Sequence, residues 1–399
     1  RILHMVLAET HEDFTFVIEA AAKKFDSADD VISGAGGSED KFQELSRAKG
    51  IKLSGNSFGF EACKFIADQL AVHDTPLLVD IDFSDIFVSR LRAELPDSLR
   101  VMSQTLLAKQ QLIRLNLSDN AFGPDGISAF ECLLTGMSSL QTLQVTNCGL
   151  GPEGGEMIAE ALSRNEGLKL KHFEAGRDRL ENKGITALAR VFAEMGSLET
   201  IHVPQNGIKD EGMSALLSSL AHSCTNLTTL RINDNWLKAQ ALPNLFKVIL
   251  RCPKLDHLNI SDLNMGQEPV IAALTAIKDS EGTVVRELFC NYNEVDSRAA
   301  AIKCCDLLEE IASKTSEERS LERVDFIGFD SMARQQRRNL QLQFADRNVT
   351  LKLFEDGEDD EEDDDDEEDQ DDEDDDEGFE QDKVDALLAK IAQIKEGAE

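Results

Sequence analysis

Apolar residues recur through most of the chain in the pattern L-x-x-L-x-L-x-x-N/C-x-Φ, where Φ is an apolar residue. The pattern appears as LIRLNLSDNAF, LQTLQVTNCGL, LKHFEAGRDRL, LETIHVPQNGI, LTTLRINDNWL, LDHLNISDLNM and VRELFCNYNEV. Its ninth position is occupied in turn by Asn120, Cys148, Asp178, Asn206, Asn235, Leu263 and Asn293, at steps of 28, 30, 28, 29, 28 and 30 residues. Seven matches in step predict an internal structural repeat.

The L-x-L centre of the pattern alternates between inward and outward positions, which predicts a short strand. The ninth residue follows that strand, where a polar side chain can bond backbone groups left unpaired by the turning chain. We therefore expect structural anchors at Asn56, Asn120, Cys148, Asp178, Asn206, Asn235 and Asn293. Beyond an anchor, residues such as Ile127, Phe130 and Leu134 recur at helical spacing and predict a return helix.

A repeat of 28–30 residues has room for one strand, one loop and one full helix. The predicted fold class is therefore α/β, a leucine-rich-repeat solenoid shaped as a horseshoe. Its parallel sheet is expected on the concave face and its helices on the convex face. Weaker copies of the pattern extend the array upstream, anchored at Asn56 and with Ile86 in the anchor position.

Four segments are expected along the chain. Residues 1–45 should cap the open apolar end of the array, and residues 46–354 should form the repeat domain. Residues 355–380 carry the acidic run and should be disordered, because like charges repel and little apolar surface is available for burial. Residues 381–399 should form a short helix, with Val384, Leu388 and Ile391 on one face. This helix is either a docking element for a partner or a local cap.

Charge narrows the choice of partners. The formal net charge is −35, and residues 355–377 hold 21 acidic side chains and no basic one, which leaves −35 + 21 = −14 for the remainder. Such a chain repels phosphate backbones and anionic membranes and favours basic protein partners. We therefore expect no nucleic-acid binding and no membrane insertion.

No catalytic or metal motif is visible. The eight cysteines form no CxxC pair and predict reduced core thiols of a cytosolic or nuclear protein. The histidines do not cluster, and His172, His202 and His257 are expected as solvated side chains at outward strand positions, so no metal site is predicted. The chain shows no Walker loop, no HExxH and no nucleophile elbow.

Polar residues on the loops that follow consecutive strands are the candidates for function. They are Asp85, Arg90, Arg92, Asp119, Asn147, Arg177 and Arg179. Arg90 and Asn147 belong to repeats two steps apart, so their backbones should lie about 10 Å from one another. Each candidate also has a purely structural interpretation: the arginines could be solvated, paired with Asp85 or Glu94, or bracing adjacent loops.

At these residues the chain resembles the Ran GTPase-activating protein family. The segments SDIFVSRLRAELP, LSDNAFGPDG, NCGLGPEGG, AGRDRLEN and PQNGI are similar to segments of that family, in the same order. The likeness runs from about residue 50 to residue 354, and an acidic tail after the repeats also matches. The chain departs from the family at Asp178, where asparagine is usual, at Leu263, and over the first 45 residues.

The resemblance implies a regulator that binds Ran in its GTP form, and Ran-binding proteins with it, and stimulates GTP hydrolysis. It implies that Asn147 positions Ran's own glutamine, without an arginine finger. Arg90, Arg92, Asp85, Asp119, Arg177 and Arg179 would then contact the partner. GTP and Mg²⁺ would be carried by Ran, so the chain would need no cofactor of its own and would be no enzyme by itself.

The same resemblance implies a role in nucleocytoplasmic transport, in the cytoplasm or at the nuclear envelope. A monomer is expected, because solenoids capped at both ends are often monomeric. The sequence shows neither a plant-type targeting domain nor an animal-type pore-attachment domain, so free cytoplasmic placement is favoured. The alternatives are non-enzymatic binders. A ribonuclease-inhibitor-like protein would be richer in cysteine, and an acidic histone-binding protein would have shorter repeats.

Overall fold

The computed structural model describes residues 14–19, 22–280, 285–314, 321–328, 332, 334–354 and 379–397. The predicted acidic run at 355–380 therefore lies outside the described residues except for its last two positions, as does the start of the predicted cap. The chain divides into two compact units, Arg1–Asp178 and Arg179–Glu399.

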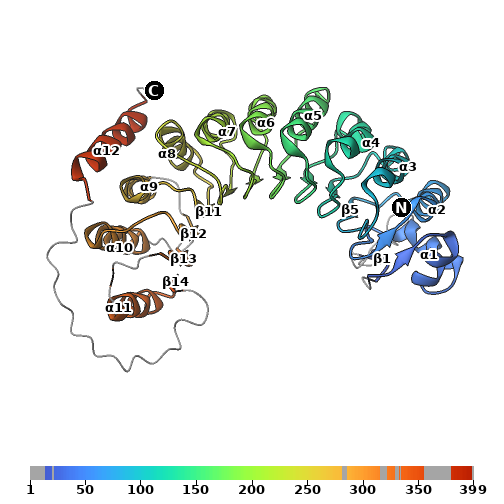
Figure 1. The fold of residues 1–399 in the computed structure, drawn as a ribbon, viewed down its shortest axis with the longest axis horizontal. Coiled ribbons are helices and arrows are strands. Elements are labelled where there is room, and N and C mark those ends of the chain that lie inside the picture. The colour runs from blue at the N-terminus through green and yellow to red at the C-terminus, as the bar shows by residue number, and fades with distance from the viewer. Residues whose placement is uncertain are drawn as a thin grey trace, which may run out of the picture. The chain divides into compact units, whose positions relative to one another are not determined.

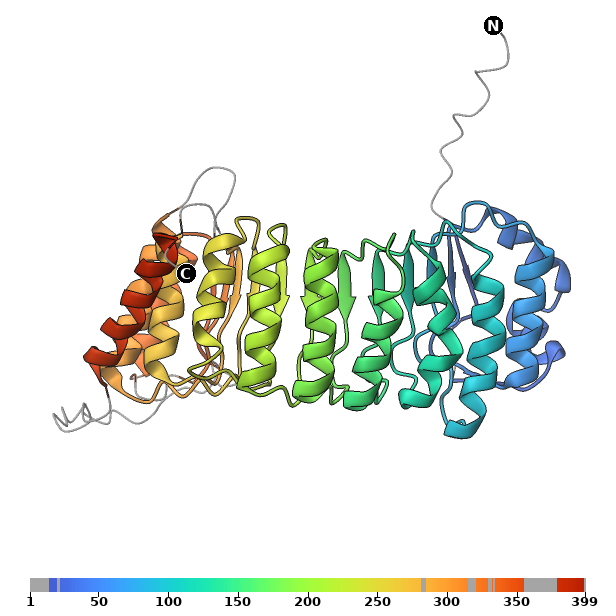
Figure 2. The same cartoon turned by 90° about the horizontal axis from the view of Figure 1, so that it is seen from above.

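The first unit is built on a parallel sheet whose strands follow the order of the chain. These strands are β1 (Thr15–Val17), β3 (Gly50–Lys52), β5 (Asp80–Asp82), β6 (Arg114–Asn116), β7 (Thr142–Gln144) and β8 (His172–Glu174), while β2 (Lys24–Phe25) pairs with β4 (Ser57–Phe58). The helices are α1 (Ala28–Gly34), α2 (Phe60–Val72), α3 (Leu95–Leu106), α4 (Gly123–Gly136) and α5 (Gly151–Ser163), with 3-10 turns η1 (Glu39–Arg47) and η2 (Arg92–Glu94). Helices α3 to α5 lie side by side on one side of the strands (Figures 1 and 2).

The second unit repeats this arrangement. Its parallel strands are β9 (Thr200–His202), β10 (Thr229–Arg231), β11 (His257–Asn259), β12 (Glu287–Phe289), β13 (Arg323–Asp325) and β14 (Thr350–Lys352). Its helices are α6 (Glu181–Met195), α7 (Asp210–Ser223), α8 (Leu242–Arg251), α9 (Gln267–Asp279), α10 (Arg298–Ser313), α11 (Arg334–Ala345) and α12 (Gln381–Lys395). The predicted solenoid of strand–loop–helix repeats is thus confirmed within each unit.

The core of each unit lies between its strands and its helices. The middle residue of each three-residue strand points inward and is buried, as Leu115 of β6 and Leu230 of β10 illustrate. From α4, the buried residues Ile127, Phe130 and Leu134 meet this layer. The alternation of the L-x-L pattern and the helical spacing after it therefore both serve one apolar layer.

A small residue six positions after the anchor lets each helix approach its neighbours closely. A Cβ atom added to Gly154, on α5, would lie 3.0 Å from Cδ1 of Ile127, on the preceding helix α4. A Cβ added to Gly212 would lie 2.8 Å from Cγ2 of Ile185, on the preceding helix. Larger side chains at these positions would force the helices apart.

The anchors tie neighbouring repeats together through backbone groups. In the first unit Asn120 is buried, and its Nδ2 donates to the backbone oxygens of Phe83 and Leu117, both at 2.8 Å. Its Oδ1 accepts the backbone N–H of Ile86 at 2.9 Å. This bond explains how Ile86 can occupy an anchor position without a polar side chain: the next repeat supplies the missing acceptor.

The second unit uses the same device. Asn235 is buried, and its Oδ1 accepts the backbone N–H groups of Asn206 and Ile208, while its Nδ2 donates to backbone oxygens. Leu263 corresponds to Ile86, because its N–H donates to Oδ1 of Asn293 at 3.1 Å. An apolar anchor is therefore tolerated wherever the following repeat carries a polar one.

Helix α12 packs against α8 and α9 of its own unit (Figures 1 and 2). Val384, Ile391 and Ile394 are buried in this contact, and Nζ of Lys395 lies 3.3 Å from Oδ2 of Asp279. The apolar side of α12 is therefore covered by α8 and α9 of the chain itself.

All eight cysteines are free, and seven of them are buried. Burial raises the pKa of Cys63, Cys252 and Cys290 to about 12, so these thiols stay protonated and unreactive near neutral pH. In the part of the chain that the structure describes, no helix combines the length and apolar character needed to cross a bilayer.

Candidate partner-binding site

One position in each repeat of the first unit has a left-handed backbone. The residue directly before the anchor position has a positive φ, with values of 51° at Asp85, 62° at Asp119, 57° at Asn147 and 58° at Arg177. This conformation costs energy for L-residues, and the cost is smallest for asparagine and aspartate among the residues other than glycine. It occurs where each chain leaves its strand, on the loop that leads to the return helix. We call Asp85, Asp119, Asn147 and Arg177 the loop row.

Strand register places the members of the loop row beside one another. Asp82, Asn116, Gln144 and Glu174 are paired across β5, β6, β7 and β8. Each member of the loop row lies three residues beyond one of these paired positions. Neighbouring strands in a sheet are about 4.8 Å apart, so the row continues the sheet at the same spacing.

Asn147 is held on both its backbone and its side chain. Its backbone N–H donates to the oxygen of Gly176 at 2.8 Å, and its side-chain Nδ2 donates to Oδ1 of Asp119 at 2.8 Å. Since a carboxylate only accepts hydrogen bonds, this contact assigns the amide nitrogen to the Asp119 side. The side chain of Asn147 is half-buried, and its Oδ1 lies on the other side of the amide group from Asp119.

Charge changes sign along the loop row. Partial burial, and after it the nearby charge of Asp119, raise the pKa of the Asp85 carboxyl. Asp119 is exposed, Asn147 is neutral and half-buried, and Arg177 is exposed. The row therefore presents two carboxylates, an amide and a guanidinium in sequence, which suits polar contacts with a protein surface rather than acid–base chemistry.

Arg90 points away from Asn147, toward the N-terminal end of its unit. Its Nε donates to Oγ of Ser57 at 2.9 Å, and its Nη2 donates to the backbone oxygens of Ser57 at 2.9 Å and Phe25 at 3.3 Å. Its Nη1 pairs with Asp26 at 2.5 Å, and only 12% of the side chain is exposed. Neither Asp85 nor Glu94 is its partner. In this structure Arg90 braces the segment 84–90 against β2 and β4.

The other arginines of the candidate set are exposed. Nη2 of Arg92 lies 3.4 Å from Oδ2 of Asp125, and its guanidinium covers Gly123 at the start of α4. Arg177 ends the loop row of the first unit. Arg179 is the first residue of the second unit and also has a positive φ, of 56°.

Sequence reasoning missed two apolar residues beside Arg90. Val88 is 38% exposed and Leu91 is 70% exposed, on the loop between β5 and η2. Exposed leucine and valine within a polar loop suit a protein–protein contact. The sequence signals them only through their place inside the SDIFVSRLRAELP segment, where the arginines are the more conspicuous side chains.

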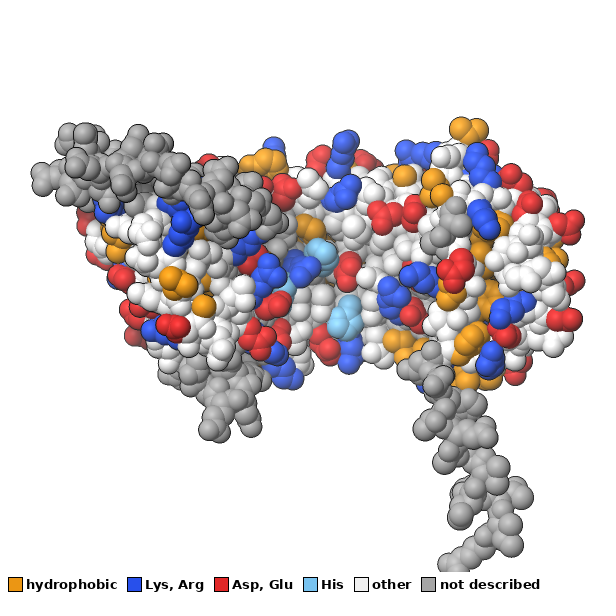
Figure 3. Space-filling view, turned by 90° about the horizontal axis from the view of Figure 1, so that it is seen from below, with side chains coloured by type: hydrophobic (Ala, Val, Ile, Leu, Met, Phe, Trp, Pro, Cys, Tyr) orange, Lys and Arg blue, Asp and Glu red, His pale blue; other side chains and the backbone are white. Residues whose placement is uncertain are grey.

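His257, in the second unit, is not the solvated side chain that was expected. Its Nε2 accepts from Nε of Arg231 at 2.8 Å, and its Nδ1 lies 2.5 Å from Oε2 of Glu287. Burial, and then the charge of Arg231, lower the pKa of His257. The prediction failed because long side chains on neighbouring strands cover an outward residue. On the face drawn in Figure 3, histidine side chains lie among basic and acidic side chains.

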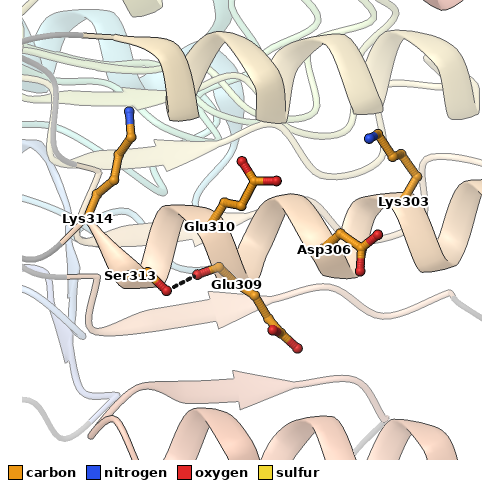
Figure 4. A pocket seen from close by; sticks show the side chains of 6 residues that line it. All are labelled: Lys303, Asp306, Glu309, Glu310, Ser313 and Lys314. Carbon is orange, nitrogen blue, oxygen red and sulfur yellow. Dashed lines mark hydrogen bonds between the residues drawn. The ribbon is translucent and has the colours of Figure 1, made fainter.

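No group of three or more His, Cys, Asp and Glu side chains that could hold a metal ion occurs among the described residues. A surface hollow lies along α10 of the second unit, with a volume of about 510 Å³. Its lining carries charges of both signs: Lys303, Asp306, Glu309, Glu310, Ser313 and Lys314. Ser313 donates to the backbone oxygen of Glu309 at 2.7 Å (Figure 4). Glu310 pairs with Lys278 of α9 at 3.2 Å. It is an ion-paired surface on one helix, separate from the loop row.

A family model described as leucine rich repeat matches residues 109–130, 136–159 and 197–217. Together with the repeated strand–loop–helix units and their anchors, this defines the chain as a leucine-rich-repeat protein. Among solved structures, an internalin of Listeria monocytogenes covers 78% of this chain at 13% identity, with a TM-score of 0.38.

The chain is similar to proteins named Ran GTPase-activating proteins, which confirms the resemblance seen in the loop segments. Identity is 44% over 179 residues with the Xenopus laevis protein and 39% over 184 residues with the Drosophila melanogaster protein. These matches span 30% of the length of each relative. With the Saccharomyces cerevisiae protein identity is 29% over 327 residues, covering 77% of both chains.

Proposed function

We propose that this chain is a GTPase activator that binds Ran in its GTP form and accelerates GTP hydrolysis. Similarity to relatives that carry this name supports the proposal, and similarity to the yeast protein extends over 77% of the chain. The observation that carries the mechanism is the loop row, where rigid strands present Asn147 to a partner, with Asp119 bonded beside it. Loops on a rigid scaffold are well suited to such contacts.

In this mechanism Asn147 positions the glutamine of Ran that orients the attacking water. Oδ1 of Asn147, on the other side of the amide group from Asp119, can accept a hydrogen bond from the glutamine amide, which would restrict how that side chain rotates. GTP, Mg²⁺ and the glutamine all come from Ran, and the activator contributes orientation. The chain then needs no cofactor of its own.

The proposal does not require an arginine finger. A finger must extend into the partner's active site to neutralise charge on the transferring phosphoryl group. Arg90 instead donates to Ser57, Phe25 and Asp26 within its own unit, which argues against that role. We assign the exposed Arg92 and Arg177, with Asp85, to contacts with the surface of Ran.

Such an activity would place the chain in nucleocytoplasmic transport, acting in the cytoplasm or at the nuclear envelope on Ran alone or on Ran with its binding proteins. The body charge of −14 outside residues 355–377 supports a basic protein partner over a nucleic acid.

The test is phosphate release from Ran loaded with GTP, mixed with the chain at one part in a hundred. We expect each activator molecule to serve many Ran molecules, so release should be complete and much faster than for Ran alone. Tight binding without faster release would indicate a non-enzymatic leucine-rich-repeat binder and would refute the assignment.

A further inference from the structure

The terminal amide of Asn147 can rotate even though the backbone of this residue is fixed. Its φ of 57° and its N–H bond to Gly176 fix the main chain. The terminal torsion of asparagine, however, has broad and roughly two-fold preferences, so the amide can present either its oxygen or its nitrogen outward. A residue that must offer an acceptor to a partner therefore needs a neighbour that selects one orientation.

Asp119 is placed to make this selection. Its Oδ1 lies 2.8 Å from Nδ2 of Asn147 and belongs to the adjacent repeat of the loop row. Turning the amide over would bring two oxygens together, because a carboxylate has no proton to donate. The wrong orientation would thus lose a charge-assisted hydrogen bond and gain a repulsion.

Asp119 is itself held in place. Its backbone N–H donates to the oxygen of Thr146 at 2.8 Å, directly beside Asn147. On its other side in the loop row stands Asp85, another carboxylate, which offers repulsion instead of a bond. The amide of Asn147 is therefore the favourable neighbour for Asp119 within the row.

We propose that Asp119 is a positioning residue, which holds the amide of Asn147 with its oxygen outward, ready to receive the glutamine of the partner GTPase. The inference rests on the proposed function and deepens it. It predicts that Asp119 acts on the rate of hydrolysis only through Asn147. A direct contact between Asp119 and Ran would instead act on affinity.

The hydrogen bond can be tested without Ran. The experiment compares the side-chain amide signals of Asn147 in NMR spectra of the full chain and of D119G, with selective asparagine labelling. Glycine suits the substitution because it accepts a positive φ without strain. The Asn147 amide protons should shift and exchange faster with water in D119G. Unchanged signals would overturn the inference.

The rate test is a double-mutant cycle with D119G, N147A and the double variant, measured on Ran loaded with GTP at saturating activator. We expect D119G to lower the maximal hydrolysis rate about tenfold or more while the affinity for Ran changes less than about threefold. In the N147A background, D119G should have no further effect on the rate.

D234G is the matched control, because Asp234 has a φ of 57° at the equivalent position of a repeat in the second unit. It should behave as the parent chain. Additive losses in the double variant, or a loss of affinity equal to the loss of rate, would show that Asp119 contacts Ran directly. Absence of any acceleration by the parent chain would instead remove the proposed function, and with it this inference.

Discussion

Oδ1 of Asp178 accepts the backbone N–H of Cys148 at 2.7 Å, in a place where neighbouring repeats use an asparagine amide. A carboxylate at this buried anchor position is destabilised in its charged form. Burial raises the pKa of Asp178 to about 7, and the N–H groups of Cys148 and Leu150 only partly offset that effect. An asparagine such as Asn120 uses its Nδ2 to satisfy carbonyl groups, which an ionised carboxylate cannot do.

The first prediction concerns D178N and pH. In the unfolded chain an aspartate titrates near about 3.9, so between about pH 4 and pH 7 the folded state binds more protons than the unfolded state. Wild-type stability should fall across that window as pH rises, and D178N should remove the slope. At pH 8 we expect D178N to be more stable by an amount on the order of 2–4 kcal/mol. Urea unfolding at pH 5 and pH 8 measures both quantities.

The converse substitution N206D is the control for that prediction. Asn206 is a buried anchor of the second unit, so an aspartate there should introduce a comparable loss of stability with rising pH. Equal slopes in D178N and the wild type would show that the carboxyl of Asp178 titrates normally.

The second prediction separates rate from affinity at Asn147. N147A removes the acceptor oxygen, and we expect the maximal rate of GTP hydrolysis by Ran at saturating activator to fall about a hundredfold, while the affinity for Ran changes less than about threefold. Stopped-flow phosphate release and titration of a non-hydrolysable Ran complex give the two values. Q205A is the control, because Gln205 has a φ of 53° at the equivalent position of the second unit. Parallel losses of rate and affinity in N147A would contradict glutamine positioning.

The third prediction concerns the role of Arg90. R90M should lower the free energy of unfolding by about 2–3 kcal/mol, because it removes charge-assisted bonds from a largely buried side chain. R92M is the comparison: its ion pair is exposed and long at 3.4 Å, so the expected change is below about 0.5 kcal/mol. Chemical denaturation of both variants measures this. A stability of R90M equal to that of the wild type would mean that the bonds to Ser57 and Asp26 contribute little.

The fourth prediction concerns His257 in acid. Its lowered pKa means that the unfolded state binds a proton more readily, so the stability it contributes is present above about pH 6.5 and lost as pH falls. The charged groups that face it are Arg231, Glu287 and Asp256. The charge of Arg231 opposes protonation of His257, and the two carboxylates favour it. H257Q should show a shallower loss of thermal stability between pH 7 and pH 5. H222Q, at an exposed position of α7, should follow the wild type, and an identical profile for H257Q would be contrary to the prediction.

The fifth prediction concerns the packing of α12. I391D places a charge in the contact with α8 and α9, so the helix should detach and its amides should lose protection in hydrogen exchange. Q393D adds the same charge on the exposed side of α12 and should leave protection unchanged. Equal protection in both variants would mean that Ile391 does not hold the helix.

The sequence by itself determined the repeats. Strands, anchors and return helices follow from local spacing, since Leu115, Asn120 and Gly126 stand at fixed separations that recur in every well-formed repeat. The same spacing aligned Asp119 with Asn147, because equivalent positions of consecutive repeats become neighbours in a parallel sheet. The family resemblance followed from the loops between these elements.

Only the tertiary structure decided which partner each side chain meets. Arg90 pairs with Asp26, which stands 64 positions earlier, outside any repeat spacing. Asn147 turns its nitrogen to Asp119, His257 is covered by long side chains from two neighbouring strands, and α12 folds back onto α8 and α9. Such contacts depend on side-chain rotation and on the docking of distant segments, and neither leaves a periodic trace in the order of the residues.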